Sequence, residues 1–346
     1  MKTISDMLDV ASRLDSGKHD HVLTPNFIGR TVQVHEDLLP CRMEHQATTH
    51  LCGRLAQRLS GKPPVPASFF NTTCDDDMYA YNLNRLIGRI TEKGGKTDWL
   101  FRCHDANVRA VVSERYPTFG LDGYWENRTL LETLYRIVRS QPQHNLVRPH
   151  VDRDKLIAKV TFKDVRIGGE HFGIGAAVSN SEIGDGQFEI YGLIQRHACT
   201  NSIVIDQGWK IKHVGGVGKF HAALSELVAS LGEAGQMAAE WLNAMMYSKE
   251  IVIPDLSEAI EKVAKGFGWD EAVTLEIGVG TEGQSNVFGL VNGITWAAHR
   301  VYGDKPEVML GMEQAASIVL DRYVTQHERT HGQVRALEFV PAQRAA

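Results

Sequence analysis

Apolar residues recur at helical spacing through much of the chain. Leu51, Leu55 and Leu59 are four residues apart, which places them on one face of a helix. The longest pattern begins at Phe220 and continues in steps of four and three to Met245. It predicts a helix of roughly 40 Å that lies across a sheet. Helices are predicted over residues 46–59, 79–90, 129–139, 220–245, 255–266, 287–301 and 312–324.

Strand patterns, separated by glycines, fill the middle of the chain. The connections between them are too short for crossover helices, so neighbouring strands should pair antiparallel. The expected fold class is α+β, with an antiparallel sheet in the middle of the chain covered by a long helix, and with helical N- and C-terminal regions. Strands are predicted over residues 99–102, 155–167, 171–179, 187–197 and 202–214.

These elements suggest a division of the chain. We expect a mostly helical N-terminal region over residues 1–95 and a core of sheet plus long helix over 96–250. A helical C-terminal region should cover 251–325, and residues 326–346 should form a tail.

The composition is that of a globular protein, with 43% hydrophobic and 23% charged residues. No stretch approaches the roughly 18 apolar residues that a membrane-spanning helix needs. The first 23 residues lack the apolar centre of a secretory signal. We therefore expect a cytoplasmic protein with no membrane contact. Its five cysteines are odd in number and show no C-x-x-C spacing, which favours reduced thiols over disulfides.

The formal net charge of −5 is unevenly distributed. Residues 81–166 contain 16 Lys and Arg against 10 Asp and Glu, a net charge of +6, so the rest of the chain carries −11. A basic segment in an acidic chain indicates one face for an anionic partner, although a solvated basic face without a partner is an equal alternative.

Within this basic segment, lysines occupy alternate positions of a predicted strand. Lys155, Lys159 and Lys163 should share the face opposite the apolar side chains that pack under the long helix. Lys210 and Lys212 share a face of a later strand. We expect these five lysines to contact a nucleic-acid backbone. The alternative is that they protect a strand edge from aggregation.

A glycine-rich turn precedes the long helix. Gly215, Gly216 and Gly218, with Lys219, offer backbone N–H groups and a cation to a phosphate at a helix N-terminus. The turn is not a Walker A loop, because His213 stands at the first glycine position and Phe220 replaces Ser or Thr. A simple strand-to-helix turn is the alternative.

Other motifs do not support catalysis or a cofactor. Cys41, His45, His50 and Cys52 match no standard zinc spacing, so no metal is expected. Residues 278–283 match G-x-G-x-x-G but lack a surrounding strand–helix–strand unit. The chain shows no nucleophile elbow, zincin or nuclease motif. We expect a protein that is not an enzyme and has no cofactor.

Several segments together resemble a family of phage- and plasmid-borne proteins called domain of unknown function 932. The similarity spans residues 45–325 and departs from the family at Ser202 and at residues 296–299. It implies a mobile-element origin and assigns no activity or site residue. The order of strands and long helix also looks like the core of the Rad52-type single-strand annealing proteins. The segments that carry the family resemblance are residues 46–55, 108–116, 178–184, 199–201 and 286–295.

The function we expect is single-stranded DNA binding by a homo-oligomer, in strand annealing or recombination of a phage or plasmid in a bacterial host cell. Two alternatives remain open. One is a phage factor that binds a protein and antagonises host defence through the acidic C-terminal helices. The other is a nucleic-acid-processing enzyme whose carboxylates assemble in space.

Overall fold

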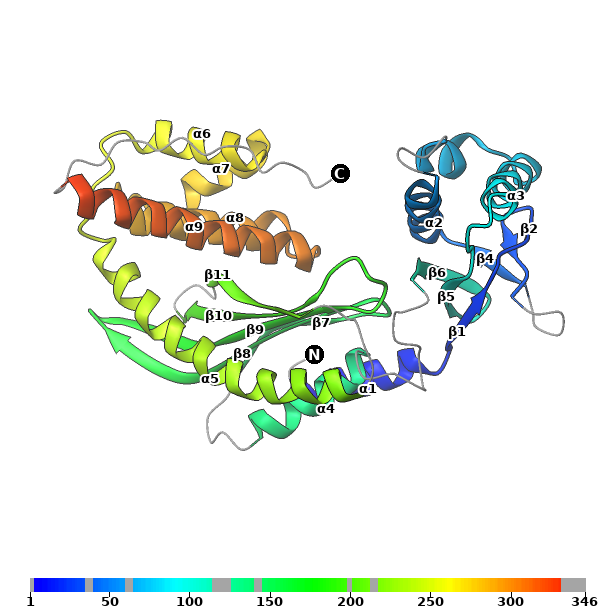
Figure 1. The fold of residues 1–346 in the computed structure, drawn as a ribbon. Helices are drawn as coiled ribbons and strands as arrows, with labels where there is room; N and C mark the ends of the chain where they lie inside the picture. The colour runs from blue at the N-terminus through cyan, green and yellow to red at the C-terminus, as the bar shows by residue number, and fades with distance from the viewer. Residues whose placement is uncertain are drawn as a thin grey trace.

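The structure is a computed structural model of the 346-residue chain. It describes residues 3–34, 40–59, 65–113, 126–139, 145–197, 201–211 and 217–330. The α+β class expected from the sequence is confirmed (Figure 1). The helices are α1 (Ile4–Asp15), α2 (His45–Arg58), the π-helical turn η1 (Phe69–Thr73), α3 (Asp76–Glu92), α4 (Asn127–Val138), α5 (Val217–Tyr247), α6 (Leu256–Phe267), α7 (Glu271–Gly280), α8 (Val287–Val301) and α9 (Pro306–Thr330). The strands are β1 (Lys18–Leu23), β2 (Phe27–Ile28), β3 (Thr31–Val32), β4 (Cys41–Met43), β5 (Trp99–His104), β6 (Asn107–Val112), β7 (Asn145–Val151), β8 (Lys155–Ile167), β9 (Glu170–Ser181), β10 (Phe188–Arg196) and β11 (Ser202–Ile211).

The N-terminal region contains a six-stranded sheet as well as the predicted helices. Its strand order is β1-β5-β6-β4-β3-β2, with β4 and β6 parallel and the other pairs antiparallel. Leu51 and Leu55 of α2 share a core with Tyr79 and Leu83 of α3 and with the sheet. The sequence does not predict β1 to β4. The strands β2, β3 and β4 are only two or three residues long, and the six residues of β1 do not alternate between apolar and polar side chains, so none of the four gives a strand pattern.

The start of α3 shows how the local sequence sets an element boundary. The Asp75 side chain accepts a hydrogen bond from the backbone N–H of Met78 at 2.8 Å, so Asp75 is the N-cap. Asp76 and Asp77 follow in the first turn, where carboxylates complement the helix dipole. The acidic run therefore fixes where this helix begins.

The middle of the chain forms the predicted antiparallel sheet, with strand order β11-β10-β9-β8-β7. α5 crosses one face, where Ala234 packs in one cluster with Leu156, Val160 and side chains of α1 and α4. α9 lies on the other face, where Leu310 packs with Ile157 (Figure 1). The expected long covering helix is confirmed, and helices cover both faces of the sheet.

Neither edge strand of this sheet is an open, regular template. In β7, Pro149 lacks a backbone N–H, Arg148 has a left-handed φ of 43°, and the register with β8 shifts between Val147 and His150. At the opposite edge, β11 lies against α9, and the backbone N–H of Asp206 donates to Ser317 Oγ at 3.0 Å.

The C-terminal helices α6 to α9 share a core with the end of α5 and the adjoining end of the sheet. The α6 helix starts at an Asp255 cap and ends at Gly268, whose left-handed φ of 71° suits glycine. None of the helices in the described part of the chain is long and apolar enough to cross a membrane.

Candidate nucleic-acid interface

Lys159 does not lie on a free surface. Its side chain is fully buried and forms an ion pair with Glu313 of α9. The second carboxylate oxygen of Glu313 accepts from Ser202 Oγ at 2.5 Å and lies 2.9 Å from His299 Nε2. The predicted exposure of Lys159 is wrong, because α9 covers the face of β8 that carries it.

Lys163 is exposed, but it lies on the other face of the sheet. Thr161 pairs with Gly175 of β9, and Lys163 pairs with the next residue of β9, Ile174, so Phe162 is an extra residue in β8. Cross-strand partners share a face, and adjacent residues of β9 face opposite ways. The expected single row of Lys155, Lys159 and Lys163 is therefore wrong, since this β-bulge breaks the alternation.

The remaining predicted site residues are paired or lie where no side chain is described. Lys155 contacts Glu307, and Lys210 Nζ lies 3.8 Å from Glu189 Oε1. Three predicted residues, Lys212, Gly215 and Gly216, lie outside the described residues. Gly218 and Lys219 belong to the first turn of α5, for which the structure describes only the backbone.

An exposed row of cations occurs instead on α3. Tyr81, Arg85 and Arg89 follow one another at four-residue spacing, and the C-cap residue Lys93 continues the row. All four side chains are exposed, and Tyr81 retains 61% of its accessible surface. Arg85 Nη1 donates to the Tyr81 hydroxyl at 2.7 Å, and the guanidinium lies 5.9 Å from the ring centroid. We call these four residues the α3 row.

The cations of the α3 row are not neutralised by neighbours. Among the described residues, no carboxylate lies within ion-pair distance of Arg85, Arg89 or Lys93, in contrast to Lys155, Lys159 and Lys210. The opposite side of α3 is buried through Leu83, Leu86, Ile87 and Ile90. The row falls inside the basic segment 81–166, and its four-residue spacing is visible in the sequence, but the alternation of lysines in the predicted strands does not reveal it.

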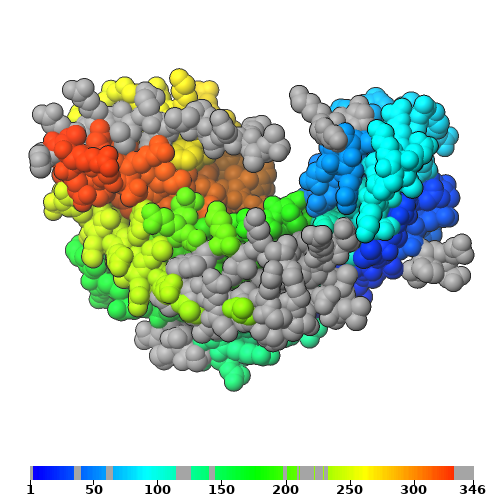
Figure 2. Space-filling view, viewed as in Figure 1, coloured from blue at the N-terminus to red at the C-terminus, as the bar shows by residue number. Residues whose placement is uncertain are grey.

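A hollow separates the N-terminal region from the C-terminal helices (Figure 2). Two cavities flank the turn between β9 and β10: one of about 260 Å³ whose lining includes Lys155 and Glu307, and one of about 220 Å³ whose lining includes Arg54. His50 of α2 contacts Asp185 of this turn, with 2.5 Å between Nε2 and Oδ1. The lining mixes both charges, so it gives no continuous basic track for a phosphate backbone.

A buried network of charged side chains joins the two sheets. Glu182, at the end of β9, is fully buried and lies 2.6 Å from Lys18 Nζ and 3.1 Å from Arg109 Nη1, both on strands of the N-terminal sheet. Arg102 of β5 contacts Glu126, which precedes α4. Two of the resembling segments, 108–116 and 178–184, thus meet in the Arg109–Glu182 pair.

The two carboxyl groups of this network differ in ionisation. Burial, reinforced by the neighbouring Glu182, raises the pKa of Glu126 to about 8. Burial opposes ionisation of Glu182 as well, but Lys18 and Arg109 outweigh it and hold the pKa of Glu182 below its usual value. The network lies in the interior and ties the two sheets together, so we do not place DNA contacts there.

Comparison with known proteins adds no relative: no family model, no curated protein and no solved structure matches this chain. The resemblance to the domain of unknown function 932 family therefore stays a prediction.

Proposed function

We propose that this protein binds single-stranded DNA through the α3 row, as a cytoplasmic factor of a phage or plasmid in a bacterial host. The observation that supports the proposal is the line of three exposed cations, Arg85, Arg89 and Lys93, which form no ion pair with any described residue, with the exposed ring of Tyr81 at its end. Proteins that bind single strands without sequence preference combine cations that follow the backbone with aromatic rings on which bases stack.

The cations and the tyrosine of the α3 row would make different contacts with DNA. Neighbouring side chains start about 6 Å apart along the helix, from a rise of about 1.5 Å per residue. The three cations would contact successive phosphates, and the Tyr81 ring would stack on a base. Because no carboxylate in the described part of the chain pairs with these cations, phosphate contact would break none of the ion pairs that the structure describes.

We also propose that the active form is a homo-oligomer larger than a dimer. A single α3 row is short, so annealing of complementary strands would require several copies of the row placed along the DNA. Three phosphate contacts alone give little affinity at physiological salt, and repetition of the row raises the effective concentration of each further contact.

The salt dependence of binding tests the proposal. Fluorescence anisotropy with a labelled oligo(dT) would give the affinity at several salt concentrations for wild type and for the Arg85→Ala/Arg89→Ala/Lys93→Ala variant. Each phosphate contact on a single strand contributes about 0.7 to the slope of log K against log salt, so the triple change should reduce the slope by about 2. Tyr81→Ala should weaken binding without altering the slope, because stacking releases no counterion.

A matched control separates this row from general charge. Arg136, Arg139 and Lys265 are also exposed cations near helix ends, and their triple change to Ala removes the same charge from other surfaces. That control should keep the wild-type slope within about 0.5 if the contacts are local. Equal slopes for wild type and the α3-row variant would refute the proposed interface.

A further inference from the structure

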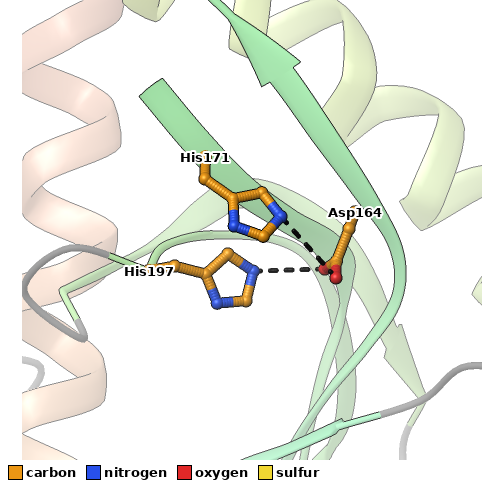
Figure 3. Close-up of side chains that lie close together, drawn as sticks. All are labelled: Asp164, His171 and His197. Carbon is orange, nitrogen blue, oxygen red and sulfur yellow. Dashed lines mark hydrogen bonds and ion pairs between the residues drawn. The ribbon is translucent and has the colours of Figure 1, made fainter. Parts of the chain in front are cut away.

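Three side chains that are distant in sequence converge at one end of the central sheet. Asp164 comes from β8, His171 from β9, and His197 directly follows β10. Asp164 Oδ1 lies 3.1 Å from His197 Nε2, and Asp164 Oδ2 lies 3.7 Å from His171 Nε2. The imidazole rings stack with centroids 4.3 Å apart, and both turn the same nitrogen toward one carboxylate (Figure 3).

The register of the sheet produces this convergence. Asp164 pairs with Gly173 across β8 and β9, and the backbone N–H of His197 donates to the carbonyl of His171 at 3.0 Å. Gly173 lies between the ligand-bearing residues. A Cβ there would come within 3.2 Å of His197 Nε2 and 2.8 Å of Thr161 Cγ2. The glycine therefore keeps the space beside the imidazole open.

The donor set suits a transition metal. The three side chains each offer one ligand atom, and these three atoms lie within 4.8 Å of one another. Small shifts of the side chains would place all three atoms around a single ion. Two imidazole nitrogens and one carboxylate oxygen form a ligand set typical of zinc and of non-haem iron. Oxygen-only ions such as calcium and magnesium prefer more carboxylates and carbonyls.

We propose that Asp164, His171 and His197 form a binding site for a divalent transition metal, with zinc as the representative ion. The site would be open, because the side chains of Asp164 and His171 are each 40% exposed and that of His197 is 26% exposed. Three protein ligands leave at least one coordination position for water or an external ligand, whereas structural zinc sites are closed by four protein ligands.

This site departs from the expectation of no metal. Positions 164, 171 and 197 are far apart in the chain and match no metal-binding motif of local spacing. Only the pairing of three strands brings them together. The earlier candidates do not converge in this way: Cys41 lies in β4 and Cys52 is buried in α2. The inference is also independent of the α3 row, which belongs to the other sheet region.

Titration of the tag-free full chain with zinc, after removal of metals by a chelator, tests the site. Isothermal titration calorimetry should show one equivalent bound to wild type. His171→Ala and His197→Ala should each weaken zinc binding by more than about 100-fold, since even changes to outer-shell partners cost 10–100-fold. His150→Ala removes a comparable half-exposed histidine that pairs with Asp152, and it should bind zinc as wild type does.

Cobalt provides a second measurement on the same proteins. Bound Co²⁺ should give visible d–d absorption in wild type and in His150→Ala, and this absorption should be lost in both ligand variants. Circular dichroism of each variant verifies that these surface changes leave the fold intact. Absence of stoichiometric zinc and cobalt binding by wild type, or wild-type affinity in folded His171→Ala and His197→Ala, would overturn the proposal.

Discussion

A buried ion pair between Lys159 and Glu313 joins the central sheet to α9. Both side chains are fully buried, and Ser202 and His299 supply further hydrogen-bond partners to the carboxylate. Burial opposes ionisation of Glu313, but Lys159 and His299 outweigh it and lower its pKa. The pair holds α9 on the central sheet.

Removal of the lysine should therefore be costly. Lys159→Ala leaves the Glu313 carboxylate buried without its main counter-charge, and we expect a loss of about 3–5 kcal/mol in the free energy of unfolding. Lys163→Ala, four residues along the same strand but exposed, should change it by no more than about 0.5 kcal/mol. Urea denaturation of both variants measures the difference. Similar small losses in both would contradict the assigned burial.

Glu126 should make stability fall as the pH rises. Burial raises the folded-state pKa of Glu126 to about 8 from the usual glutamate value of about 4.5, so the folded state favours the protonated form. The stabilisation from this group is complete below about pH 4.5 and is lost as the pH rises through 8, at up to about 1.4 kcal/mol per pH unit. Glu126→Gln lacks this titration, so its stability relative to wild type should increase from pH 5 to pH 8.

Urea denaturation at several pH values would follow this trend. Glu132→Gln provides the control, because Glu132 lies on the exposed side of α4 and forms an exposed ion pair with Arg128. Its stability relative to wild type should vary little over the same range. Parallel pH profiles for wild type and Glu126→Gln would show that Glu126 is ionised in the folded protein.

At the scale of elements, the sequence pattern of β8 predicts where the strand begins and ends but does not predict its bulge. Its bounds, Lys155–Ile167, are those that the alternation predicts. The bulge at Phe162 is not predictable from that alternation, because it depends on how β8 pairs with β9. The convergence of Asp164, His171 and His197 is not predictable for the same reason, because it depends on how the strands pair. Helices with long apolar stripes, such as α5, were predictable because the pattern repeats over many turns.

Gly175, opposite the bulge, should tolerate no side chain. A Cβ there would lie 1.9 Å from the Val160 carbonyl oxygen and 2.6 Å from Thr161 Cα, both backbone atoms. We expect Gly175→Ala to lower the free energy of unfolding by about 3 kcal/mol or more. Gly235→Ala is the matched change, since nothing lies within 4 Å of its Cβ position in α5; it should raise stability by about 0.5–1 kcal/mol. Chemical denaturation that ranks the two variants the other way would contradict the close approach of β8 and β9.

At the scale of the whole molecule, the proposed assembly makes a direct prediction. The annealing role requires several copies of the α3 row along a strand, so light scattering should give a mass well above twice 38.5 kDa, at least when oligo(dT) is present. The Arg85→Ala/Arg89→Ala/Lys93→Ala variant should lose any increase that DNA causes. A 38.5 kDa monomer with and without DNA would contradict assembly.

The interrupted edge of the central sheet limits how such an assembly can form. Another chain cannot extend the ladder at β7, because Pro149 offers no N–H and the shifted register bends the strand away from regular pairing. At the other edge, α9 lies against β11. Backbone-templated polymerisation, which leads to cross-β fibres, is thereby disfavoured even when many copies crowd on one DNA strand. Contacts between subunits at the central sheet would then be made by side chains, so single surface substitutions there can tune or abolish assembly without loss of the fold.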